Sequence, residues 1–216
     1  MMKHLRLGIF LSAICFCFLS GMVNAAAEDV QSYIEKGEAH SKKGQSDKAI
    51  AEFNKALELD PKNARVFNDR GLEFWFKGDI DSALADYNKA LEINPSLAMV
   101  YNNRGLLYGK GKGELDLAIA DLTKAIKIEP KFIDAYVSRG MAYSLKNEFD
   151  RAIADYNKVL EINPMVEDAY FNRATVYYYK GDYQKAWDDV HSLQSIRGQV
   201  PPQFIQDLNS KMPEPK

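Results

Sequence analysis

Apolar residues recur at helical spacing in paired segments along most of the chain. In the segment 64–77 they fall close to a 3.6-residue period, which predicts an amphipathic helix. Gly78 interrupts this segment, and the acidic side chains within 79–81 offer oxygens that cap a new helix. The apolar stripe of that second helix comprises Ile80, Ala83, Leu84, Tyr87, Ala90 and Leu91. It ends at Asn94-Pro95, because proline disfavours the helical conformation of the residue before it.

The same pair of segments occurs five times, at intervals of 34 or 35 residues. Prolines fall at Pro61, Pro95, Pro130 and Pro164, and alanines at Ala49, Ala83, Ala118, Ala152 and Ala186. A small residue recurs at Gly37, Gly71, Gly105, Gly140 and Ala174. The one extra residue lies within 109–113, which we expect to form a turn because turns tolerate insertions. Helical hairpins of this size cannot bury their apolar faces alone, so the pattern predicts a stack of hairpins.

The residue types of one unit resemble a known family. Tyr101, Gly105, Tyr108, Ala118, Ala125 and Pro130 stand at the offsets of the tetratricopeptide repeat. The resemblance gives repeats at 30–63, 64–97, 98–132, 133–166 and 167–200, the last of them divergent, and a C-terminal capping helix at 201–212. It implies an all-α, right-handed superhelical solenoid of helix-turn-helix repeats. It also implies that the first helix of each pair lines a concave groove that binds peptides or partner helices.

The N-terminal segment has a basic start, an apolar run over 7–23 and small residues at 25–27. This pattern is typical of a secretory signal peptide, so we expect 1–25 to be cleaved and the protein to be exported, either to the periplasm or out of the cell. An uncleaved anchor helix is the alternative, because the apolar run is near the shortest that spans a bilayer. Cleavage would remove Cys15 and Cys17 and leave a chain with no stable membrane span and no disulfide.

Charge and motifs argue against several classes of function. The 28 basic and 30 acidic residues give a net charge of −2, without the basic stripe that nucleic-acid binding requires. We find no paired-histidine metal spacing, no phosphate-binding glycine loop and no nucleophile motif. His40 stands where the repeat has a packing aromatic, and His191 lies near aspartates on a predicted helix. We therefore expect no cofactor, no metal and no catalysis.

Asparagines on the first helices are one set of candidate binding residues. By the family resemblance, the positions that face the groove include Asn68, Asn102, Asn103 and Asn172. Their amides can hydrogen-bond the backbone of an extended peptide, which gives sequence-tolerant binding. The alternative is that these side chains are solvated or cap a local turn.

Aromatic residues form the second set of candidates, because three consecutive rings on one helix cannot all face one core. These candidates are Trp75, Phe76, Tyr178 and Tyr179, together with Phe171. They either form apolar pockets for a partner or pack between successive units. A row of arginines, Arg70, Arg104, Arg139 and Arg173, recurs just before the small residue of each unit. We favour a structural role for this row, with each stem laid along its neighbour and each head paired with a carboxylate, over anion binding.

Two hypotheses for function follow from these patterns. The first is a non-catalytic scaffold or adaptor of the cell envelope or secreted space, which binds a peptide or helix of another protein in the groove. The second is a structural protein that assembles with itself through the ends of the stack or through aromatic patches. Because the same scaffold hosts many partners, the resemblance does not select the partner.

Overall fold

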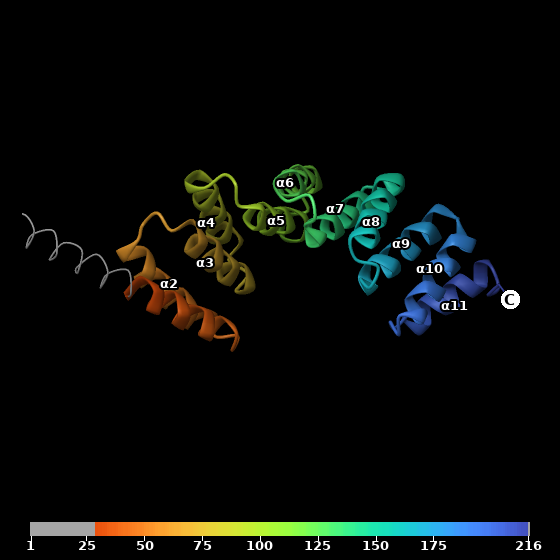
Figure 1. The fold of residues 1–216 in the computed structure, drawn as a ribbon, viewed down its shortest axis with the longest axis horizontal. Helices are drawn as coiled ribbons and strands as arrows, with labels where there is room; N and C mark the ends of the chain where they lie inside the picture. The colour runs from red at the N-terminus through yellow and green to blue at the C-terminus, as the bar shows by residue number, and fades with distance from the viewer. Residues whose placement is uncertain (1–28, 216) are drawn as a thin grey trace, which may run out of the picture. The chain divides into compact units, whose positions relative to one another are not determined.

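The computed structural model describes residues 29–215, and every regular element in this range is helical. The expected signal peptide at 1–25 lies outside the described residues. The chain forms two compact units, one extending to Pro95 and the other beginning at Ser96. Figure 1 shows the helices of each unit. Within residues 29–215, no helix has the length and apolar character needed to cross a bilayer.

The first unit contains a helix over 29–41 followed by three more helices. These are α2 (Ser46–Leu59), α3 (Ala64–Phe76) and α4 (Ile80–Ile93). Helix α3 packs against both α2 and α4. The close approach favours glycine, since a Cβ on Gly71 would lie 3.0 Å from the ring of the buried Tyr87 and that ring would have to shift. The cap expected at the start of α4 is formed by Asp79, whose side chain accepts a hydrogen bond from the Ser82 amide at 3.2 Å.

The second unit continues the alternation of paired helices. Its elements are α5 (Ala98–Leu106), η1 (Leu107–Lys112), α6 (Leu115–Ile128), α7 (Ile133–Leu145), α8 (Phe149–Ile162), α9 (Glu167–Lys180), α10 (Tyr183–Ser195) and α11 (Pro202–Lys211). Each helix from α5 to α10 packs on its neighbours in chain order, and the first helices α5, α7 and α9 also contact one another in succession. The predicted all-α fold of stacked helical pairs is confirmed.

From the sequence we expected the extra residue of the third repeat to lie in a turn, and this prediction is wrong. In four repeats the same backbone bond closes the first helix, for instance from the Glu148 amide to the Tyr143 carbonyl at 2.9 Å. In the third repeat the corresponding bond joins the Glu114 amide to the Tyr108 carbonyl, also at 2.9 Å, and encloses one more residue. The chain accommodates this residue by widening the end of the helix into the π-helical turn η1. π-helical turns of this kind occur often at functional sites.

The arginine row is structural, as we favoured from the sequence. The guanidinium of Arg139 donates to both oxygens of Asp155, at 2.9 and 2.7 Å, from the first helix of a repeat to the second. It also lies over the rings of Tyr136 and Tyr143. The same bidentate pairing recurs as Arg70–Asp86, Arg104–Asp121 and Arg173–Asp189. The hydrogen bond from Arg104 to Asp121 raises the pKa of that guanidinium, so the row stays charged.

The C-terminal helix α11 caps the last repeat, which confirms that part of the predicted fold. Leu208 of α11 is fully buried in one cluster with Trp187 of α10. Phe204 and Ile205 pack against the same cluster. The indole Nε1 of Trp187 donates to the Met212 carbonyl at 3.0 Å, which fixes the end of the capping helix. The apolar end of the stack is therefore covered by the chain itself.

Candidate functional site

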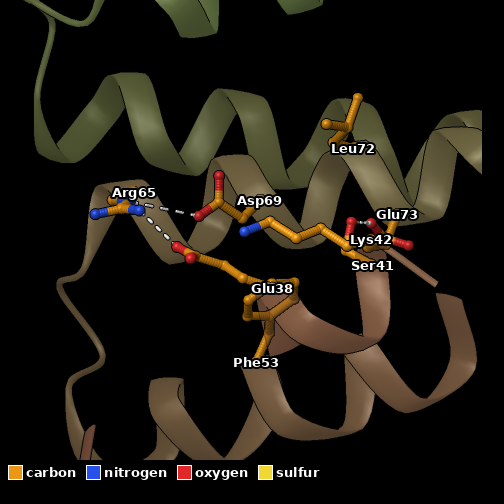
Figure 2. Close-up of a pocket in the computed structure, with 8 residues that line it drawn as sticks. All are labelled: Glu38, Ser41, Lys42, Phe53, Arg65, Asp69, Leu72 and Glu73. Carbon is orange, nitrogen blue, oxygen red and sulfur yellow. Dashed lines mark hydrogen bonds and ion pairs between the residues drawn. The ribbon is translucent and has the colours of Figure 1, made fainter. Parts of the chain in front are cut away.

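The first helices of the first unit form a pocket of about 250 Å³. It lies between the helix over 29–41 and α3, as Figure 2 shows. Its lining residues are Glu38, Ser41, Lys42, Phe53, Arg65, Asp69, Leu72 and Glu73. Phe53 comes from α2 and Lys42 from the turn after the helix over 29–41, whereas the other lining residues lie on that helix or on α3.

Charged side chains dominate this first pocket. Arg65 bridges Glu38 at 2.5 Å and Asp69 at 3.6 Å. Burial raises the pKa of the Asp69 carboxyl, against the opposing effect of the hydrogen bond from Asn68. Glu73 is only 2% exposed and accepts a hydrogen bond from the Ser41 hydroxyl. Its second oxygen, Oε2, has no hydrogen-bond partner among the described residues. The partly exposed carboxylates of Glu38 and Asp69 therefore offer hydrogen-bond acceptors to the N–H groups of a ligand.

The second unit carries a pocket of different chemistry at the corresponding place, between α5–η1 and α7 and over α6. It is lined by Gly105, Leu106, Gly109, Lys110, Leu115, Ala118, Leu122, Ser138, Met141, Ala142 and Leu145. Only Lys110 and Ser138 contribute polar side chains to this lining. The first pocket suits polar groups of a ligand, whereas the second suits an apolar side chain.

The large apolar side chains with the greatest exposure share one position in the repeat. Phe76 and Leu145 are 68% exposed and Tyr179 is 67% exposed. Each lies in the last turn of a first helix, in α3, α7 and α9 respectively. The same position carries Lys42 in the first repeat and Lys110 in the third. Isolated exposed apolar residues are common, but recurrence at one repeat position makes these three side chains candidates for contact with a partner.

The candidate asparagines are mostly enclosed. Asn68, Asn102 and Asn103 are buried, and Asn172 is half-buried. Asn68 donates to Asp69 at 3.1 Å, which ties it to the rim of the first pocket. A peptide would therefore meet neighbouring side chains before it met the three buried amides.

The candidate aromatics divide into two groups. Phe171 and Tyr178 lie with their ring centroids 5.4 and 5.8 Å from that of Phe204, in edge-to-face contact with the capping helix. Tyr179 touches Tyr178 at 5.5 Å but remains exposed. The structure thus gathers Phe171, Tyr178 and Tyr179 into one cluster, in which only Tyr179 is largely free to meet a partner. In the first unit Trp75 is half-buried beside the exposed Phe76.

Several pocket residues were missed by the sequence analysis, above all Glu38, Glu73, Gly109 and Leu145. Comparison of the last turns of the first helices would have identified Leu145, which stands 34 residues before Tyr179. No sequence signal marks Glu73, because its burial depends on packing against the preceding repeat.

The two histidines of the described residues serve local contacts. His40 hydrogen-bonds Gln45 at 2.8 Å. The Nε2 atom of His191 lies 3.0 Å from Glu214 Oε1, and its ring stacks on Trp187 with the ring centroids 5.7 Å apart. Within residues 29–215, no group of three or more acidic, histidine or cysteine side chains is arranged to hold a metal ion.

Comparison with known proteins agrees with this fold. Models described as the TPR repeat and the tetratricopeptide repeat match residues 37–78, 72–111, 98–132 and 133–165, more than half of the chain. No curated protein sequence matches the chain.

Solved structures resemble the chain over most of its length. The MamA protein is 26% identical, with 81% of this chain and 100% of that chain covered and a TM-score of 0.68. PilF from Pseudomonas aeruginosa is 21% identical, with 86% of this chain and 85% of that chain covered and a TM-score of 0.76. YrrB, described as a TPR protein with an unusual peptide-binding site, is 24% identical. The match covers 89% of this chain and 96% of that chain, with a TM-score of 0.66. The likeness to PilF and YrrB shows the fold.

Proposed function

Because the chain belongs to the tetratricopeptide-repeat family, we propose that it is a non-catalytic interaction scaffold that holds a peptide segment or helix of another protein along its first helices. The observation that carries the proposal is the recurrence of the exposed side chains of Phe76, Leu145 and Tyr179 at one repeat position, where Leu145 also lines the apolar pocket. Burial of such side chains by a partner is favourable, by about 1.5–3 kcal/mol for each one fully buried.

The architecture supports this proposal in a second way. In four of the repeats a bidentate arginine–carboxylate pair joins the first helix to the second. A surface held rigidly before binding loses little conformational entropy when a partner arrives. The fold is able to carry a peptide site, since YrrB is described as having one.

We also propose that the protein works outside the cytoplasm, after cleavage close to Ala25. The support is the basic, apolar and small-residue pattern of 1–25. Sequencing of the mature N-terminus, together with cell fractionation, tests this step. A protein that retains Met1 and stays in the cytoplasm would refute it.

Affinity capture from the native compartment tests the scaffold function. The bait variants are Leu145→Ala and Tyr179→Ala, and Leu117→Ala is the matched control because Leu117 is a 48% exposed leucine on the second helix α6. We expect both bait variants to lose a protein that the control retains. Equal capture by all of these proteins would refute binding on the first helices.

The alternative, self-assembly, makes a different prediction in the same variants. Light scattering across a concentration series would then show a wild-type oligomer that Tyr179→Ala dissociates. Under our proposal the oligomeric state of Tyr179→Ala equals that of the wild type.

A further inference from the structure

One repeat position in the lining of the apolar pocket of the second unit carries no side chain. Gly109 occupies the place that Ser41, Trp75, Ser144 and Tyr178 hold in the other repeats. A Cβ built on Gly109 would lie 3.5 Å from the Cβ of Ala118, an ordinary contact distance. The backbone there does not demand glycine for its conformation, since Gly109 is not among the positive-φ residues. Gly109 therefore leaves room that packing alone does not require.

The hollow at Gly109 suits an apolar group better than water. Its cavity volume is about 30 Å³, which by size alone is enough for a water molecule. An ordered water needs about two to four polar partners, whereas the only polar side chains in the lining are those of Ser138 and Lys110. A hollow of this size with apolar walls suits an aliphatic side chain better than the larger ring of an aromatic one.

The rim of the pocket adds a charge preference. Lys110 is exposed and lines the pocket, and no hydrogen bond or ion pair engages it within residues 29–215. The neighbouring cations are occupied, since Lys112 pairs with Glu114 and Lys146 pairs with Asp116 and Glu148. An incoming carboxylate would therefore find Lys110 available. No acidic side chain lines the pocket to compete for it.

From these observations we propose that the pocket around Gly109 receives a branched aliphatic side chain of a partner peptide, next to an acidic residue that pairs with Lys110. This inference rests on the proposed scaffold function and specifies its ligand. Leu145, exposed at the rim, would be covered by the same peptide. The equivalent pocket of the first unit, lined by Glu38, Asp69 and Glu73, has a different chemistry and would not share this preference.

The test is a selection of random twelve-residue peptides, displayed on phage, against the full chain. We expect the wild type to enrich peptides that carry Val, Ile or Leu beside Asp or Glu. A synthetic peptide from that set should bind Gly109→Leu at least about tenfold more weakly, because the new side chain fills the hollow. Ala154→Leu, which adds a leucine at an exposed place on α8, is the control and should bind as the wild type does.

A second variant keeps the test decisive if Gly109→Leu disturbs the helix. Lys110→Glu should shift the selected peptides from acidic to basic residues beside the aliphatic one, whereas the control Lys124→Glu should not. The pocket assignment is wrong if the wild type enriches peptides but Lys110→Glu, and Gly109→Leu where it folds, select the same sequences as the wild type. The scaffold function would stand in that case. If the wild type enriches no peptide at all, both proposals fail.

Discussion

Removal of the Asp155 carboxylate tests whether the arginine row holds the helical pairs together. Asp155 and Arg139 are 7% and 16% exposed at their side chains, and two hydrogen bonds join them. In Asp155→Ala the guanidinium keeps only the Thr123 hydroxyl, at 3.0 Å, and the rings of Tyr136 and Tyr143. A buried charge would then lack its counterion.

The expected loss follows from the burial of this pair. Breaking a buried ion pair costs about 3–5 kcal/mol. We expect a value near 3 kcal/mol, because the residual exposure of Arg139 lets water reach part of the guanidinium. Replacing both partners, in Arg139→Met/Asp155→Leu, removes the stranded charge and should recover most of the loss.

Urea unfolding, followed by the fluorescence of the buried Trp187 in a Trp75→Phe background, measures this effect in the second unit. The free energy of unfolding falls by about 1–3 kcal/mol for each molar urea. The urea concentration at the unfolding midpoint of Asp155→Ala should therefore fall by about 1 M or more. An unchanged midpoint would contradict the structural role of the row. A double variant as unstable as the single one would contradict the stranded-charge explanation.

Three further predictions concern packing, each measured by the same urea titration. Gly140→Ala should lower the free energy of unfolding by about 1–3 kcal/mol, because its Cβ would lie 2.8 Å from the Tyr156 ring. The control Gly109→Ala should leave the free energy of unfolding unchanged, and equal losses in both variants would refute this packing. Ala152→Leu should cost about 1–3 kcal/mol, since Ala152 is fully buried, and a wild-type midpoint would refute the helix crossing. Tyr178→Ala should cost about 0.5–1.5 kcal/mol beyond lost burial by loosening α11, and unchanged Trp187 fluorescence would contradict that contact.

The sequence predicted the repeats because their signals are local and recur. Gly71 and Ala83 mark a close crossing, and a ring such as Tyr87 follows at helical spacing, so one unit confirms another. The arginine role was also predictable, since a guanidinium just before a small residue has a carboxylate within reach on the paired helix. These features depend on residues within one hairpin.

The candidate site was harder to predict because it depends on contacts between hairpins. Tyr178 was expected to be a contact for a partner or to pack between units, and only the structure shows that Phe204 of the capping helix lies against it. The burial of Asn102 and Asn103 likewise depends on how successive helices stack. The extra residue near Gly109 was assigned to a turn, because the sequence does not distinguish a longer loop from a π-helical turn.

Site-specific photo-crosslinking in the source cell tests the central claim most directly. A photoreactive amino acid would replace Leu145 or Tyr179 on the first helices, and Lys124 or Ala154 on the exposed faces of α6 and α8. We predict adducts of one partner protein at 145 and 179 and none at 124 and 154. Adducts confined to 124 and 154 would contradict the assignment of the first helices as the binding surface.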